Sequence, residues 1–378
     1  MPDTGILRRR AAALSAAALL AVAACGEALA YKRTKNPKRK KRPAAAAEAG
    51  PAKPVGPPPL LAGGRWDPAV RGSIEEFIRA AGKDSPDHDP NDPPAAVFAL
   101  NEVVIPNDLG EVVFQKMVLS SSTAPGFDFK MDEDFWRILP AAFGQARLYF
   151  DYQQLLAMPV SVWPDQPGLR RMRKGFVRMY RDFCARRGRK ECRALLARLF
   201  RGFTEDEAVG YAKDVIEAEL ARPVGYAFLE EKDSDPAPEK IRMGLQPAPE
   251  MEDLMRVLAK EGFDVWIISE DAQVEVRQLA KHFGLPPERG IGIKAAVSTS
   301  TSLMTDEIEP PFPFRSGKVE AVSSIVGKPP AIAVAGQAED APLLSYGEGL
   351  RLLMDSGDES LRRVAVDRGW LIQPAFPP

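Results

Sequence analysis

The sequence has few of the residues on which metal and nucleophile sites most often depend. Among its 378 residues there are only two histidines and three cysteines. His88 lies in a turn-rich segment and His282 lies late in a predicted helix, so a histidine-based metal site or catalytic triad is not expected. The formal net charge is −1, which gives no indication of nucleic-acid binding. The remaining composition, 45% hydrophobic and 27% charged, is typical of a soluble globular protein.

The N-terminal segment has no apolar run long enough to span a bilayer comfortably. Arg8 to Arg10 precede the apolar stretch Ala11 to Ala24, and together they predict that residues 1–24 are a signal peptide. The stretch ends in Val-Ala-Ala-Cys, which resembles a bacterial lipobox and predicts cleavage before Cys25 with lipid attached to its thiol. An ordinary signal peptide cleaved after Ala30 is the alternative. We therefore expect an exported, membrane-associated protein of the bacterial cell envelope, with a periplasmic or secreted protein as the alternative.

Residues 25–65 are predicted to form a disordered tether. The segment Lys32 to Arg42 is strongly basic, and an Ala/Pro/Gly-rich stretch follows it to Gly64. One interpretation is that the basic segment binds anionic lipid headgroups or another polyanion. The other is a solvated spacer beside a membrane anchor. Nucleic acid is not an expected partner of an exported chain.

Two cysteines remain beside Cys25. An oxidising compartment would favour a disulfide between Cys184 and Cys192. On one continuous helix, residues eight apart are separated by about 12 Å, which is too far for a disulfide. Gly188 lies between them and could turn the chain into a hairpin. The sequence therefore leaves a disulfide and two free thiols as equal alternatives.

Strand-like and helix-like segments alternate over much of the remaining chain. This alternation predicts an α/β fold with a parallel, doubly wound sheet, whose ligand site lies beyond the carboxyl ends of the strands. The predicted core covers residues 66–125 and 245–378, and an all-helical domain, residues 126–244, is inserted into it. The expected strands cover residues 95–98, 265–268, 291–297, 303–308, 331–334 and 350–353.

The order of several short segments resembles the haloacid dehalogenase-like (HAD) superfamily, in particular its phosphoserine phosphatase-like branch with a helical cap. No single segment is decisive, but their order and spacing together are specific. The resemblance implies a Rossmann-like core and the inserted helical cap. The segments are Pro94–Val104, Asn107–Glu111, Gly262–Ser269, Gly317–Ala321 and Ala335–Leu344.

The resemblance also implies a chemistry that this sequence has lost. In the family an aspartate at the end of the first strand attacks phosphorus, and an aspartate two residues later serves as acid and base. Magnesium, held by carboxylates, neutralises the phosphate charge. Here the Asp-x-Asp-x-Thr positions are Ala99, Asn101 and Val103, and Gly336 and Gln337 replace the metal-binding aspartate and serine of the fourth motif. We expect no intact catalytic residue and no metal site; magnesium would be a cofactor only of an active enzyme.

Three of the family's site residues are retained: Ser269 and Lys318, which the resemblance implies bind the phosphoryl group, and Asp340, which remains of the acidic pair in the fourth motif. One interpretation is that they still bind a small anion or a phosphorylated ligand without metal. The other is that Lys318 and Asp340 form a structural ion pair. Asp108 and Glu111 are not expected to replace the nucleophile, because their backbone does not point toward the same place.

Three hypotheses of function follow. The first is an exported, catalytically inactive pseudophosphatase or binding module, so the chain is expected not to be an enzyme. The second is an active phosphomonoesterase that uses atypical residues. The third is a structural or interaction lipoprotein of the envelope, whose basic arm and basic cap face, around Arg170 to Arg178, bind polyanions or partners.

Overall fold

A computed structural model describes residues 57–119, 126–229 and 238–377 of the chain. Residues from Pro57 onward form one compact unit. The predicted signal peptide, Cys25 and the basic segment Lys32 to Arg42 lie outside the described residues. In the part that is described, no helix has the length and apolar character needed to cross a membrane.

The centre of the fold is a seven-stranded sheet with β1 in its middle. The strand order is β6-β5-β4-β1-β7-β8-β9, and all neighbouring pairs are parallel except β5 and β6, which are antiparallel. The expected parallel α/β sheet is therefore confirmed, with an antiparallel edge strand added. The strands are β1 (Ala95–Ala99), β4 (Asp264–Ala272), β5 (Gly290–Val297), β6 (Met304–Glu309), β7 (Ile332–Ala335), β8 (Leu350–Asp355) and β9 (Leu371–Pro374).

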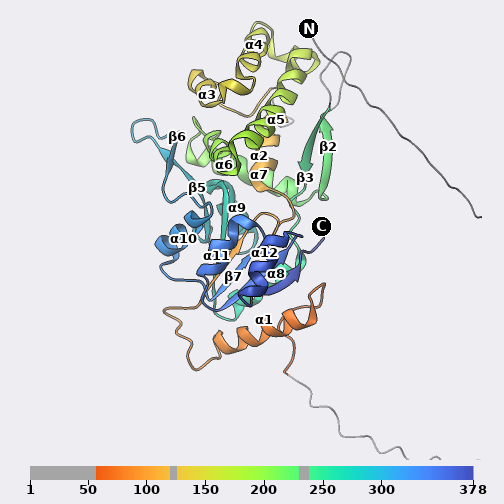
Figure 1. Cartoon of the computed structure of the whole chain (residues 1–378). Coiled ribbons are helices and arrows are strands. Elements are labelled where there is room, and N and C mark those ends of the chain that lie inside the picture. The colour runs from red at the N-terminus through yellow and green to blue at the C-terminus, as the bar shows by residue number, and fades with distance from the viewer. Residues whose placement is uncertain (1–56, 120–125, 230–237, 378) are drawn as a thin grey trace, which may run out of the picture. The chain divides into compact units, whose positions relative to one another are not determined.

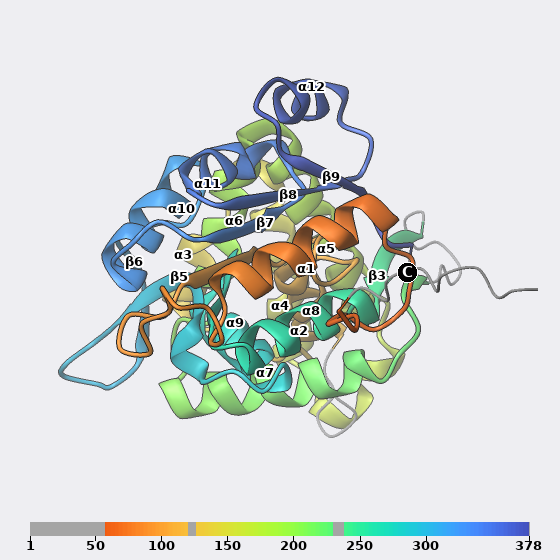
Figure 2. The same cartoon turned by 90° about the horizontal axis from the view of Figure 1, so that it is seen from below.

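The central strands are apolar along their whole length because helices cover both faces of the sheet. All five residues of β1 are buried. Ala96 and Phe98 belong to the large core cluster, whereas Val97 packs in a second cluster with Ala321 and Leu343. Figure 2 shows α11 and α12 on one side of the sheet and α1 and α8 on the other. A strand enclosed in this way needs apolar residues at every position instead of an alternating pattern.

Several short core elements were not predicted from the sequence. They are the edge strand β9, the helix α11, and the division of the helical segment after β6 into α10 and a π-helical turn. These short elements are difficult to recognise from periodicity. The core helices are α1 (Pro68–Ala81), α2 (Leu109–Leu119), α8 (Pro249–Lys260), α9 (Gln273–His282), α10 (Ser316–Ala321), the π-helical η4 (Val322–Val326), α11 (Ala341–Tyr346) and α12 (Glu359–Asp367), with short turns η3 (Pro287–Arg289) and η5 (Ala338–Asp340).

The segment inserted between α2 and α8, here called the cap, lies at one end of the core (Figure 1). It is mostly helical, but the expectation of an all-helical cap is wrong. Gly225–Leu229 (β2) and Glu239–Met243 (β3) pair as a two-stranded antiparallel sheet. Strand pairs this short carry a weak sequence signal, because their pairing depends on contacts outside the segment. The helices are α3 (Glu133–Ile138), α4 (Gln145–Leu156), α5 (Pro167–Arg187), α6 (Arg189–Arg198) and α7 (Glu205–Leu220), with 3-10 turns η1 (Ala141–Phe143) and η2 (Val160–Asp165).

A sharp corner at Gly188 separates α5 from α6. Its backbone has φ 84° and ψ 167°, a region that favours glycine. The corner brings the Cα atoms of Cys184 and Cys192 to 5.1 Å, and the structure joins the two residues by a disulfide. Of the two alternatives that the sequence left open, a disulfide and two free thiols, the structure has the disulfide.

Candidate functional site

Four of the five segments that carry the family resemblance meet at the carboxyl edge of the sheet. Asn101 follows β1, Ser269 lies near the end of β4, and Gln337 follows β7. Lys318 reaches the same place from α10. Because parallel strands present their carboxyl ends at one edge, residues far apart in sequence form one site there.

The position of the lost nucleophile is occupied by a buried methyl group. Ala99 is the last residue of β1 and is 2% exposed. Asn101, at the acid/base position, points into the site, where its Nδ2 lies 2.8 Å from Asp271 Oδ2 and 3.4 Å from Ser269 Oγ. Its Oδ1 accepts a hydrogen bond from the main-chain N–H of Leu109 at 3.1 Å. Asn101 therefore ties the strand end to α2 as a structural amide and cannot cycle a proton near neutral pH.

The residues present do not fit the magnesium site that HAD chemistry implies. Neither Ala99 nor Gly336 offers an oxygen ligand from its side chain. A Cβ at Gly336 would lie 2.9 Å from Val103 Cγ2 and 3.0 Å from the main-chain oxygen of Met354, so the space for a carboxylate has closed. Gln337 Nε2 donates to the main-chain oxygen of Asn101 at 3.3 Å. Across the described residues, no cluster of three or more His, Cys, Asp or Glu side chains is arranged to hold a metal ion.

The retained phosphate-binding residues are already engaged by carboxylates. Lys318 forms an ion pair with Asp340, and its Nζ lies 3.0 Å from Glu270 Oε1. The Ser269 hydroxyl donates to Asp271 Oδ2 at 2.6 Å. The structure therefore has the ion pair between Lys318 and Asp340 that one of the two interpretations expected. Glu270 is a second partner of Lys318 that was not predicted from the sequence. A phosphate that bound here would have to displace the carboxylates that already accept from Lys318 and Ser269.

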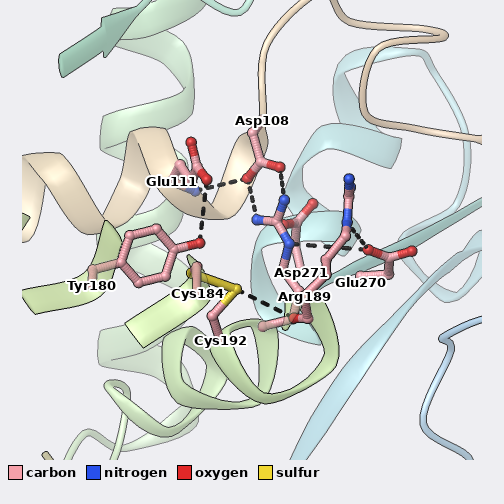
Figure 3. The surroundings of a disulfide bond; sticks show 9 residues. Asp108, Glu111, Tyr180, Cys184, Arg189, Cys192, Glu270 and Asp271 are labelled. Atoms are coloured by element: carbon pink, nitrogen blue, oxygen red, sulfur yellow. Dashed lines mark hydrogen bonds and ion pairs between the residues drawn. A yellow bond between two sulfur atoms is a disulfide. The ribbon is translucent and has the colours of Figure 1, made fainter. Parts of the chain in front are cut away.

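The cap closes the site with two arginines from the start of α6. Arg189 Nε donates to Glu270 Oε2 at 2.6 Å, and Figure 3 shows this contact beside the disulfide of Cys184 and Cys192. Arg193 is buried and forms a bidentate ion pair with Asp108. Its Nη1 also lies 3.6 Å from Asp271 Oδ1. These guanidinium groups balance carboxylates that would otherwise repel one another in a buried site.

The position of Asp108 corrects one expectation from the sequence. Its side chain does reach the site, where its Oδ2 lies 3.4 Å from Asn101 Nδ2. The reason is that Asp108 caps α2, with Oδ1 accepting from the main-chain N–H of Glu111 at 3.0 Å, and the cap position turns toward the strand ends. Because Arg193 takes both of its oxygens, Asp108 forms part of the closed network and is not an available nucleophile.

The ion pairs set opposite pKa directions for neighbouring carboxyls. Burial alone would raise the pKa of Asp108, but the adjacent Arg193 charge outweighs it and holds the pKa below its usual value. Burial, followed by repulsion from Asp108, raises the pKa of Asp271. For Lys318, burial opposes the charge, yet attraction to Asp340 and Glu270 raises its pKa. The site is thus internally neutralised by its own side chains.

Four residues that define this network were not predicted from the sequence: Arg189, Arg193, Glu270 and Asp271. One signal was present, because Glu270 and Asp271 directly follow Ser269 at the end of a buried strand. Two buried carboxylates in succession require counter-charges. Which residues supply them depends on how α6 packs over the sheet, and the local sequence does not contain that information.

Comparisons with known proteins support the fold and leave the function open. No protein-family model and no curated protein matches the sequence. A conserved, functionally unknown protein from Anaerococcus prevotii aligns over 83% of this chain and 94% of its own, with TM-score 0.70 and 17% identity, and so shares the fold.

Two HAD-type structures align more loosely. A HAD family hydrolase from Salmonella enterica serovar Typhi covers 72% of this chain and 66% of its own, with 14% identity and TM-score 0.33. A phosphoserine phosphohydrolase-like protein from Francisella tularensis covers 72% and 92%, with 11% identity and TM-score 0.35. In this chain the four motif segments meet at one edge of a sheet with the expected strand arrangement. The α/β fold with a mainly parallel sheet that the sequence predicted is confirmed by the strand order of this chain.

Proposed function

We propose that this protein is a catalytically inactive, pseudophosphatase-like module with a HAD-like fold. The observation that carries the proposal is the closed ion-pair network where phosphate and metal would meet. Ser269 and Lys318, the donors that would bind a phosphoryl group, are engaged by Asp271, Glu270 and Asp340. Ala99 supplies no nucleophile. Loss of a nucleophile alone typically costs several orders of magnitude in rate.

The depth of burial supports the same conclusion. Asn101, Glu270, Asp271 and Lys318 are all buried. Opening the site would separate Arg193 from Asp108 and expose the network to water. A substrate would have to displace these contacts before any chemistry began. A role in binding or in structure does not require this opening.

The direct test is phosphatase activity of the purified chain on an aryl phosphate with magnesium. We expect no turnover above the protein-free rate. A parallel variant, Ala99→Asp with Asn101→Asp, restores the two lost carboxylates. A further variant adds Gly336→Asp with Val103→Ala, because Val103 occupies the space that an aspartate side chain would need. Thermal unfolding of each variant verifies that it is folded. Turnover by the wild-type chain that disappears in Lys318→Ala would sink the proposal and favour an active phosphomonoesterase.

A second test addresses the retained anion-binding residues. Inorganic phosphate at millimolar concentration is expected to leave the Tm unchanged, since Lys318 already has two carboxylate partners. A ligand that binds only the folded state raises the Tm in a concentration-dependent way. A rise with phosphate that is lost in Ser269→Ala would favour an anion-binding module, which is a different kind of pseudoenzyme.

The location of the protein is also a proposal, supported by the sequence alone. The basic n-region, the apolar stretch to Ala24 and the lipobox-like Cys25 favour an exported protein anchored by lipid at Cys25. Mass spectrometry of the mature N-terminus tests this. A diacylated or triacylated Cys25 is expected, whereas a free N-terminus after Ala30 would indicate an ordinary secreted protein. The matched variant Cys25→Ser should lose the lipid and the membrane association that depends on it.

A further inference from the structure

The cap exposes an unusual concentration of apolar side chains at one end. Of the twelve large hydrophobic residues that are exposed among the described residues, six lie between positions 149 and 162, with exposures of 36–54%. We call this surface the apolar tip. It consists of Tyr149, Phe150, Leu156, Met158, Val160 and Val162. Contiguous apolar patches of this kind mark sites of interaction with a membrane or another molecule, whereas scattered single residues do not.

The fold holds these side chains outward in a fixed arrangement. Helix α4 buries Leu148, Asp151 and Leu155 on one face, so Tyr149 and Phe150 remain on the other. Every residue from 156 to 162 is exposed, and the run ends at the buried Trp163, whose Nε1 donates to the main-chain oxygen of Met158 at 3.3 Å. The backbone of the tip is therefore anchored while its apolar groups face solvent.

Arginines and carboxylates both border the apolar tip. Asp132 and Glu133 line the same groove as Tyr149 and Leu156. The Arg147 guanidinium lies 5.5 Å from the centre of the Phe150 ring and its side chain is 63% exposed. Arg170 donates to the main-chain oxygen of Asp165 at 3.3 Å, and Arg171 lies 2.9 Å from Asp151. Asp151 is a buried residue of α4, and its carboxylate forms ion pairs with Arg147 and Arg171. It therefore adds little negative charge to the surface. Apolar and aromatic side chains bordered by arginine are the composition of surfaces that lie in the membrane interface.

We propose that the apolar tip inserts into the headgroup and upper acyl region of a lipid bilayer. This goes beyond the proposed inactivity of the site and does not depend on it. Lipid at Cys25, if attached as predicted, would place the chain beside a membrane.

The length of chain before the described residues permits both contacts at once. Positions 26–56 separate Cys25 from Pro57. An extended chain of this length reaches about 95 Å at roughly 3.1 Å per residue, whereas a folded domain of this size is about 50 Å across. An anchor at Cys25 and the apolar tip could therefore reach the same bilayer from any attachment point on the domain.

The test is flotation with vesicles of phosphatidylglycerol and phosphatidylcholine. The parent protein is the predicted mature chain, residues 25–378, with Cys25→Ser. This substitution prevents lipid attachment, so an attached lipid cannot cause the binding. Sodium chloride at 0.5 M screens the electrostatic contribution of Lys32 to Arg42, because the Debye length falls to a few ångströms. The tip variant is Leu156→Asp with Val160→Asp. The matched control is Val366→Asp, an exposed valine (65%) of α12 outside the tip.

We expect the parent and Val366→Asp to float with the vesicles and the tip variant to bind at least tenfold more weakly. In the parent, brominated acyl chains should also quench tryptophan fluorescence, because Trp163 lies directly behind the tip. Equal Tm values verify that the tip variant is folded. Equal vesicle binding by the tip variant and the control would overturn the proposal. A concentration-dependent dimer that the tip variant abolishes, without vesicle binding by the parent, would also overturn it and identify the surface as a contact between copies.

Discussion

Arg193 of the cap forms a buried, bidentate ion pair with Asp108 of the core, and the two residues are 85 positions apart in the sequence. The pair lies at the centre of a network that includes Asp271, Glu270 and Arg189. In an enzyme of this fold the same place would have to receive substrate and metal. Here the ion pair holds the cap helix α6 against the strand ends and closes the site, as the proposed inactivity requires.

The first prediction concerns the Arg193 charge. Arg193→Met keeps most of the side-chain volume but leaves Asp108 and Asp271 buried without their cation. Truncating one partner of a buried ion pair typically costs about 3–5 kcal/mol of folding free energy. Urea unfolding of this variant should show that loss, whereas Arg187→Met, an exposed residue at the end of α5, should stay within about 0.5 kcal/mol. Similar stabilities for both variants would mean that the network contributes nothing net.

The second prediction concerns Glu275, whose carboxyl is buried in the first turn of α9. Burial, followed by repulsion from Asp271 and Asp108 and partly offset by Arg193, raises the pKa of Glu275 well above its usual value. Between the unfolded and the folded pKa, the folded state binds more protons than the unfolded state. Stability attributable to Glu275 therefore falls as pH rises above about 4.5.

Glu275→Gln removes this titration and keeps an oxygen that can accept from the Ala272 N–H, a bond of 3.0 Å in the wild-type chain. The stability of the variant relative to the wild type should rise between pH 4 and pH 8, by up to about 1.4 kcal/mol per pH unit inside that window. The measurement is Tm against pH for both chains, with the exposed Glu288→Gln as a control whose difference stays flat. A difference for Glu275→Gln that falls with pH would contradict the raised pKa.

The third prediction concerns the disulfide. Closing a loop of about nine residues is worth about 2–3 kcal/mol in the chain-entropy model. Adding a reductant should lower the Tm of the wild-type chain, and Cys184→Ser with Cys192→Ser should have the lowered Tm without reductant and no further response to it. Cys25→Ser in every chain prevents mixed disulfides. A reductant effect that persists in the double variant would have to come from another cause.

The fourth prediction compares two helical glycines. A Cβ added at Gly72 in α1 meets no atom within 4 Å, whereas one at Gly110 in α2 would lie 2.7 Å from Asp271 Oδ1 and 3.2 Å from Leu196 Cδ1. Gly72→Ala should stabilise the protein by about 0.5–1 kcal/mol through helix propensity. Gly110→Ala should destabilise it by about 1–3 kcal/mol, because it crowds the carboxylate that Gly110 N–H contacts at 3.1 Å. Chemical unfolding measures both, and stabilisation by Gly110→Ala would show that the network is loosely packed.

The sequence by itself determined the features that depend on short-range pattern. The buried run at β1 predicted the central strand, which the structure has. The capping box that opens α7, made by Thr204 and Glu207, follows an equally local pattern. Strand ends and motif spacing also fixed where Ala99, Asn101 and Gly336 fall; that these residues leave a site without the family's chemistry stays a prediction. These signals lie within a few residues of one another, so they survive without knowledge of the fold.

Only the tertiary structure decided how the site is filled. Arg193 meets Asp108, and Arg189 meets Glu270 across 81 positions, because α6 packs over the strand ends after the corner at Gly188. The same corner decided between free thiols and a disulfide, since it sets the distance between two Cα atoms that the sequence places only by separation. Exposure of the apolar tip was equally hidden, because a run of apolar residues is the same in sequence whether a fold buries it or presents it to solvent. Charge compensation, pairing distance and burial all depend on neighbours from distant parts of the chain, and only packing brings those neighbours together.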